Sequence, residues 1–196
     1  MGSATFQIKR TNLILAYLIA RLMSIVIPIH SIVKDTEKML VQAADLCHEG
    51  EFEEAIVLYN KILASNPDHL DAIIDKGVAL QNMGKFKQAL TCFAKATKLS
   101  PENVTAILNE GTALHSLGKF DDAISRYEKA LFLDDKCAMA LAYKGLSLGE
   151  KGMMSEALAC FKDALQIDDT YDIAQISKEI AEKMLKSQSE TSRKKS

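Results

Sequence analysis

The sequence contains few of the residues that interrupt helices, with three prolines and nine glycines among 196 residues. Proline breaks helix interiors and glycine destabilises them, so their scarcity favours long helices joined by short turns. An excess of one charge sign is also lacking, because the formal net charge is −2. A strongly basic surface is the usual mark of a nucleic-acid-binding protein, and its absence argues against that class.

Cysteine is scarce too, and the four cysteines are scattered along the chain at Cys47, Cys92, Cys137 and Cys160. They form no Cys-x-x-Cys pair, and no histidine stands at ligand spacing, so a zinc motif is not indicated. We predict reduced, half-buried thiols in a cytoplasmic protein that carries no cofactor. A disulfide pair or a metal site is the alternative.

A regular period runs through the middle of the sequence. Glycines stand at the evenly spaced positions 50, 84, 118 and 152. Large apolar residues and alanines follow each glycine at constant offsets, which indicates four repeat units. The equivalent residues are Phe52, Phe86, Phe120 and Met154, then Ala55, Ala89, Ala123 and Ala157, then Tyr59, Phe93, Tyr127 and Phe161. The four units are 36–69, 70–103, 104–137 and 138–171.

Each unit divides into two helical stripes. In the second unit, Ile73 and Gly77 share one stripe, at i and i+4, and Phe93 and Ala96 share the other, at i and i+3. These spacings place apolar residues on one face of each helix. A single helical hairpin cannot bury its apolar face alone, but stacked hairpins can. The predicted fold is all-α, a right-handed α-solenoid of four helix-turn-helix units.

The pair Gly84-Lys85 also invites comparison with a phosphate-binding loop. Such a loop needs a Ser or Thr after the lysine to bind magnesium, whereas Lys85 is followed by Phe86. Gly84 instead suits the residue just after a helix end, where the left-handed backbone costs glycine nothing. We therefore predict a turn at this position and no nucleotide site.

The pattern of glycine, aromatic residue, alanine and proline at this period resembles the tetratricopeptide repeat over about 36–171. In two units the proline of that pattern is replaced by Asp135 and Asp169, which we expect to act as helix N-caps. Small residues such as Gly77 and Ala89, where helices cross, are expected to let the helix axes approach closely. The early tryptophan of the family pattern is replaced by Met39, Ile73, Ile107 and Leu141.

One further helix is predicted after the last unit, over 172–187. Ile173, Ile176, Ile180 and Met184 form its apolar stripe, and a terminal repeat needs such a half-polar lid. We expect the stripe to pack onto the last unit, with a dimerisation helix as the alternative. The basic tail 188–196 is predicted to be disordered.

The segment 1–33 does not follow the repeat. Its part 13–33 is mostly apolar and is long enough to cross a hydrocarbon layer. Arg21 and Pro28 weaken that interpretation. Three alternatives stay open: a membrane anchor, a helix packed on the solenoid, and an upstream extension that is not translated. An anchor would tether the cytoplasmic protein to a membrane.

No set of residues indicates catalysis, because no nucleophile, base or metal-ligand pattern occurs, and we predict that the protein is not an enzyme. The resemblance implies a concave groove lined by the first helix of each unit. It places these residues in the groove: Leu40, Ala44, Ile74, Asp75, Val78, Gln81, Leu108, Asn109, Thr112, His115, Ala142, Tyr143 and Leu146.

These positions form an apolar ladder edged by hydrogen-bonding groups, which would suit an extended peptide or a helix. Family members that hold acidic chaperone C-termini use basic clamp residues, whereas this chain has Leu40, Ala44 and Asp75 there. We predict a non-enzymatic scaffold or adaptor that binds a protein segment, and that Leu108→Asp weakens binding without unfolding. The alternatives are a membrane-tethered assembly factor, anchored through 13–33, and a homo-oligomeric scaffold.

Overall fold

The computed structural model describes residues 34–195, and every regular element in that range is an α-helix. The first described helix, called the leading helix below, occupies residues 34–49. The other helices are α2 (Phe52–Ser65), α3 (Leu70–Asn82), α4 (Phe86–Leu99), α5 (Val104–Ser116), α6 (Phe120–Leu133), α7 (Ala138–Glu150), α8 (Met154–Ile167) and α9 (Asp172–Lys195).

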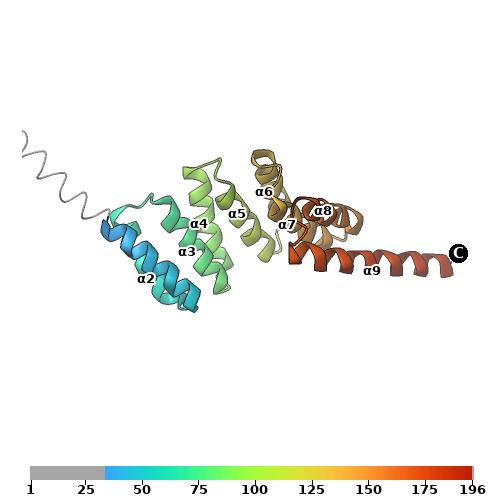
Figure 1. The fold of residues 1–196 in the computed structure, drawn as a ribbon, viewed down its shortest axis with the longest axis horizontal. Helices are drawn as coiled ribbons and strands as arrows, with labels where there is room; N and C mark the ends of the chain where they lie inside the picture. Colours follow the sequence, from blue (N-terminus) through green and yellow to red (C-terminus); the bar gives the residue numbers. More distant parts are fainter. Residues whose placement is uncertain (1–33, 196) are drawn as a thin grey trace, which may run out of the picture.

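The helices form a row of antiparallel pairs in chain order (Figure 1). The leading helix pairs with α2, α3 with α4, α5 with α6, and α7 with α8. Each second helix also packs against the first helix of the next pair, and α9 packs on α8 and, to a lesser extent, on α7. The predicted all-α stack of four helical hairpins followed by a further helix is confirmed.

The glycine between the two helices of a pair is a turn residue, as predicted. Gly84 has a φ of +70°. Its backbone N–H donates to the carbonyl of Gln81 at 2.9 Å, and the N–H of Lys85 donates to the carbonyl of Leu80 at 2.8 Å. These two bonds satisfy carbonyls at the end of α3 in the Schellman arrangement. The same positive φ occurs at Gly50, Gly118 and Gly152.

The prediction that Asp135 and Asp169 cap helices is wrong. The N-cap of α7 is Cys137, and α9 begins only at Asp172. An N-cap side chain must stand directly before the first turn to reach its N–H groups, and both aspartates lie too early in the loop. The first helices of units two and three have side-chain caps instead. Nδ1 of His69 accepts from the N–H of Ala72 at 3.4 Å, and Oδ1 of Asn103 accepts from the N–H of Ala106 at 2.8 Å.

The core of each unit is an aromatic ring, and in units two to four this ring is seated on a glycine of the same unit. A Cβ added at Gly77 would lie 2.5 Å from Cε1 of Phe93. The three atoms nearest to that Cβ all belong to Phe93, so the space left by the glycine is filled by the ring. Ala89 is also fully buried.

The apolar stripe of α9 does not form the packed face, so that prediction is wrong. Ile176 and Ile180 are 59% and 52% exposed, whereas Ala174 and Ala181 are buried. Small side chains permit the close approach of α9 to α8, and the large ones are turned outward. Ile173 and Met184 are also exposed.

The helix also continues beyond residue 187, through Lys195. The prediction of a disordered tail over 188–196 is therefore wrong for its described part, 188–195. The segment 172–195 contains neither glycine nor proline, so the sequence holds no residue that would stop the helix.

Candidate functional site

The predicted groove residues lie on the first helices of the four units, and these helices are neighbours in space. Contacts join α3 with α5, α5 with α7, and α7 with α9. A segment bound along this row of first helices would therefore meet successive units in order. The row is called the first-helix face below.

The groove residues differ in how much surface they offer. Ala44 and Val78 are exposed. Four of the predicted residues are buried among the helices, namely Ile74, Leu108, Thr112 and Ala142. The others are partly exposed, and they are Leu40, Asp75, Gln81, Asn109, His115, Tyr143 and Leu146. The exposed and partly exposed members are those that can make direct contact with a ligand.

Hydrogen bonds link neighbouring first helices across this face. The hydroxyl of Thr112 on α5 donates to the side-chain oxygen of Gln81 on α3 at 3.3 Å. Nδ1 of His115 on α5 lies 2.9 Å from Oγ of Ser147 on α7. Ser147 is fully buried, and it was not predicted as a site residue. The signal for it was a serine at the position where units two and three have alanine.

Two of the partly exposed groups have shifted pKa values. Burial raises the pKa of the Asp75 carboxyl, and the neighbouring Asp71 carboxylate adds to this, while His69 opposes it. Burial lowers the pKa of His115, and the Glu150 carboxylate acts in the opposite direction. His115 thus favours its neutral form, which is consistent with its hydrogen bond to Ser147.

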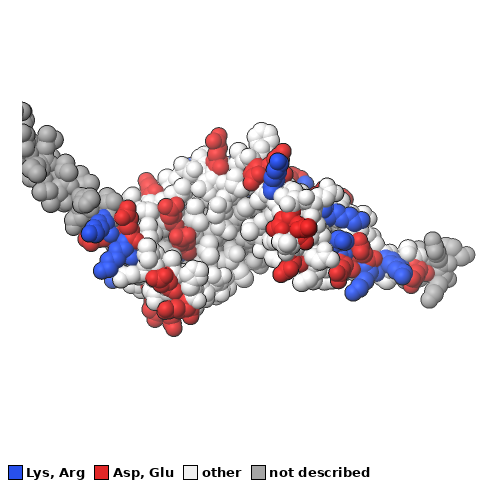
Figure 2. Space-filling model, in the orientation of Figure 1, with Lys and Arg blue, Asp and Glu red and all other residues white. Residues whose placement is uncertain are grey.

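At the groove positions of α3, α5 and α7 the first-helix face carries acidic groups and neither Lys nor Arg. Asp71 and Asp75 are its acids, and Glu150 follows at the end of α7. Lys76 and Lys144 belong to the same helices but lie elsewhere, since Lys76 lines a pocket with residues of α4 and Lys144 pairs with Glu128 of α6. Figure 2 shows that, on the side drawn, Lys and Arg lie near the start of the described row and over its second half, from α6 onward. The other residues at equivalent positions are Ile74, Val78, Gln81, Thr105, Leu108, Asn109, Thr112, His115, Met139, Ala142, Tyr143, Leu146 and Gly149.

The first-helix face extends onto α9, which sequence reasoning missed. Ile176 and Ile180 stand one repeat period after Ala142 and Leu146. The repeat period therefore contained the signal for both. A pocket of about 340 Å³ lies between α7, α8 and α9. Its lining residues are Gly145, Leu146, Gly149, Glu150, Met154, Phe161, Ser177, Ile180, Ala181 and Met184.

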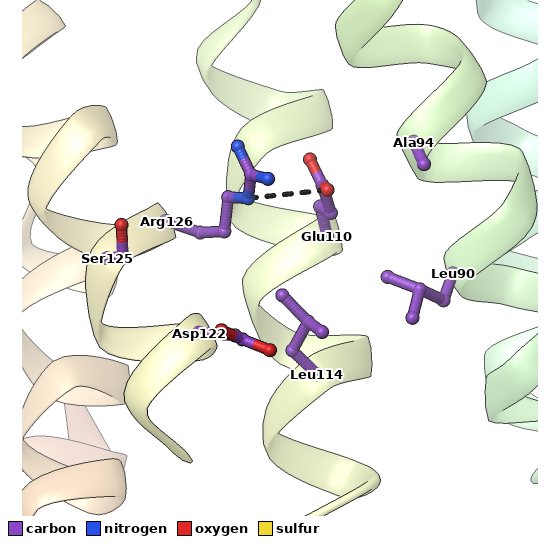
Figure 3. Close-up of a pocket in the computed structure, with 7 residues that line it drawn as sticks. All are labelled: Leu90, Ala94, Glu110, Leu114, Asp122, Ser125 and Arg126. Carbon is purple, nitrogen blue, oxygen red and sulfur yellow. Dashed lines mark ion pairs between the residues drawn. The ribbon is translucent and has the colours of Figure 1, made fainter. Parts of the chain in front are cut away.

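A second pocket of about 370 Å³ lies between α4, α5 and α6 (Figure 3). It contains a buried carboxylate, Glu110, whose Oε1 lies 3.3 Å from Nε of Arg126. The hydroxyl of Thr97 donates to Oε2 of Glu110 at 3.0 Å. Both carboxylate oxygens thus have partners, which indicates that Glu110 joins helices of two units. Leu90 and Leu114 give the pocket its apolar part.

Two other predictions concern metals and membranes. Among residues 34–195, no cluster of histidine, cysteine or acidic side chains has the geometry to hold a metal ion. Within the same range, no helix has the length and apolar character needed to cross a membrane. The predicted anchor segment 13–33 lies outside the described residues.

Solved structures of similar fold cover most of the described range. A MamA protein from Desulfovibrio magneticus matches with 18% identity and a TM-score of 0.64, over 81% of this chain and 96% of that one. A tetratricopeptide-repeat protein of Thermus thermophilus matches with 20% identity and a TM-score of 0.65, over 70% of this chain and 77% of that one.

The first such domain of Spaghetti (RPAP3), bound to the HSP90 peptide SRMEEVD, matches with 22% identity and a TM-score of 0.57, over 59% of this chain and 92% of that one. At these identities the structures show likeness of fold alone.

No curated protein sequence matches the chain. Family models for the tetratricopeptide repeat match residues 46–99 and 108–172. The two matches together span more than half of the chain, and they agree with the repeat period and with the paired helices. The chain belongs to the tetratricopeptide-repeat family.

Proposed function

We propose that this protein is a non-enzymatic scaffold that binds a segment of a partner protein along its first-helix face. Tetratricopeptide-repeat domains are generally protein–protein interaction modules and are typically non-catalytic. The observation that carries the proposal is the row of accessible side chains on neighbouring first helices. Apolar Val78 and Leu146 alternate there with the hydrogen-bonding groups of Asn109 and Tyr143.

The charge of this face points to the kind of segment it would accept. Asp71, Asp75 and Glu150 would attract a basic segment and repel an acidic one. The RPAP3 domain is bound to the peptide SRMEEVD, which carries three acidic residues near its end. Because the groove positions of α3, α5 and α7 include Asp75 and neither Lys nor Arg, we propose a different class of ligand.

The experiment compares partners captured by three versions of the full chain in cells. The first is the wild type. The second is Val78→Arg, Leu146→Arg, which puts charge and bulk on the first-helix face at two accessible positions. The third is Phe132→Ser, a matched control on the second helix of unit three. Phe132 is 89% exposed and lies outside the first-helix face. Crosslinking and mass spectrometry identify the captured proteins.

We expect the partners of the wild type to be retained by Phe132→Ser and lost by the double variant. Circular dichroism should show equal helix content for all three chains, because the altered residues are accessible. The opposite pattern, with loss in Phe132→Ser and retention in the double variant, would move the binding surface to the second helices.

A further inference from the structure

The lines of contact between neighbouring first helices, called seams below, are bridged by side chains in two places and are not bridged at a third. Gln81 on α3 reaches Thr112 on α5, and His115 on α5 reaches Ser147 on α7. Gln81 and His115 occupy the same position in successive units, one repeat period apart. The next residue in this series is Gly149, which has no side chain to reach α9.

The lack of a side chain at Gly149 leaves unoccupied space beside α7. A Cβ added at Gly149 would meet nothing within 4 Å, apart from its own helix turn. The backbone there is ordinary helix, since the positive φ values in the described residues belong to the turn glycines. The pocket of about 340 Å³ between α7 and α9 occupies this seam. Gly149 thus interrupts the series of bridging residues, and it is not a turn glycine.

The lining of this pocket is mostly apolar. Leu146 contributes from α7, and Ile180 and Met184 contribute from α9. Ile180 is 52% exposed, and Met184 is also exposed, so each presents apolar surface to the opening. Large side chains exposed in this way around a concave site are typical of a surface that binds another molecule.

We propose that the pocket at Gly149 anchors one large apolar side chain of a partner segment whose adjoining residues are basic. The inference rests on the proposed function and names the chemistry of its ligand. The pocket would take a leucine, methionine or phenylalanine side chain. The adjoining residues would lie along α7, α5 and α3.

Charge complementarity gives the ligand its basic character and its direction. Glu150 lines the pocket, and Asp75 and Asp71 follow toward the other end of the first-helix face. Basic residues of the ligand would therefore lie on the α3 side of its apolar anchor. On α9, on the other side of the anchor, exposed Lys183 stands beside exposed Glu179 and Glu182. The direction therefore rests on Glu150, Asp75 and Asp71.

The variant that tests the pocket is Gly149→Gln. It places in unit four the residue that unit two has at the same position. Because Ile180 stands on α9 where α5 has Thr112, the added side chain would fill the seam by its volume and not by the hydrogen bond that Gln81 makes. Helix stability should rise or stay the same, since glycine is a poor helix former and the added side chain has room. A second variant, Ile180→Asp, puts a charge on the pocket wall at an exposed position, where unfolding is not expected.

The probe is a displayed library of short random peptides, selected on the wild-type full chain. Selected peptides are then measured by fluorescence anisotropy against the wild type and both variants. We expect the selected peptides to contain a large apolar residue with lysine or arginine on one side of it. Gly149→Gln, which fills the pocket, should weaken their binding about tenfold or more. This factor corresponds to the free energy of burying one large apolar side chain.

The outcomes separate this inference from the proposed function. Peptides that bind equally to Gly149→Gln and Ile180→Asp, but not to Val78→Arg, Leu146→Arg, would overturn the pocket and keep the groove. Acidic peptides, or no selected peptide that depends on Gly149, would also overturn it. A synthetic peptide of residues 9–33 is tested in parallel. Gly149-dependent binding of that peptide in place of library peptides would overturn the partner assignment and give the pocket to segment 9–33 of this protein.

Discussion

The ring of Phe93 lies directly against the backbone of Gly77, and a Cβ there would stand 2.5 Å from the ring. The two residues belong to the two helices of one unit, so this contact sets how closely α3 and α4 approach. The contact is not peculiar to unit two. The equivalent pairs are Gly111 with Tyr127 and Gly145 with Phe161.

Gly77→Ala is therefore expected to destabilise the protein although alanine is the better helix former. Overpacking costs about 1–3 kcal/mol, and the gain in helix propensity returns up to about 1 kcal/mol. The measurement is the urea midpoint at constant m-value. Gly149→Ala is the matched control, and it should stabilise by about 0.5–1 kcal/mol because its Cβ enters open space. Equal effects at both glycines would refute the packing account.

Tyr127→Phe is expected to leave the protein equally stable or more stable. The Tyr127 hydroxyl is buried and, among the described residues, has no hydrogen-bond partner. An unpaired buried hydroxyl costs about 1–3 kcal/mol, and phenylalanine already fills the equivalent positions in units two and four. Thermal and urea unfolding measure the change. A loss of more than about 1 kcal/mol would mean that the hydroxyl has a partner after all.

Leu108→Asp should unfold the protein or nearly so, contrary to the prediction made from sequence. Leu108 is 8% exposed and packs in a cluster with Ile107, Tyr127 and Ala140. Burying a carboxylate and removing apolar contacts there should cost at least about 3 kcal/mol. Val78→Asp is the comparison, since Val78 is 36% exposed, and it should cost about 1 kcal/mol or less. Circular dichroism and urea titration distinguish the two; similar losses would contradict the assignment.

His115 should make folding stability depend on pH. Its pKa is lowered from the ordinary 6.5, chiefly by burial. Between the folded and unfolded pKa values the unfolded chain binds more protons, so stability falls as the pH drops through about 6.5. His115→Gln should flatten this fall, measured as the urea midpoint between about pH 5 and pH 7. An unchanged slope would assign the effect to other groups.

Two truncations test which part of α9 closes the stack. Residues 186–190 are exposed, whereas Ala174 and Ala181 are buried. A chain that ends at Leu185 should keep its urea midpoint. One that ends at Tyr171 bares apolar surface of α8 and should lose about 2–4 kcal/mol. If the shorter chain were as stable as the longer one, α9 would not be a cap.

Much of the fold follows from the sequence because a repeat is a local pattern. Gly84 marks a helix end by its need for positive φ, and the repeat period places the same turn in every unit. Periodicity within a helix gives the direction of each side chain around that helix alone. It does not say which neighbouring helix that side chain meets.

That limit explains the errors. Leu108 and Ile176 occupy equivalent positions two repeat periods apart, yet Leu108 is buried and Ile176 is exposed. Unit three has a second helix on its other side, whereas α9 begins no further pair within the described residues. The Gly149 gap was equally hidden, since a bridge between helices is visible only once Gln81 and His115 are placed in space.

The contacts between helices carry a mechanical consequence. From α2 to α9 they join helices that are first or second neighbours along the chain, so no contact ties α2 to the far end of the row. Such an arrangement can lengthen by a small opening at every junction, as a spring does. A partner that spans several first helices would stiffen this spring, and a pulling force along the row would loosen its hold on that partner.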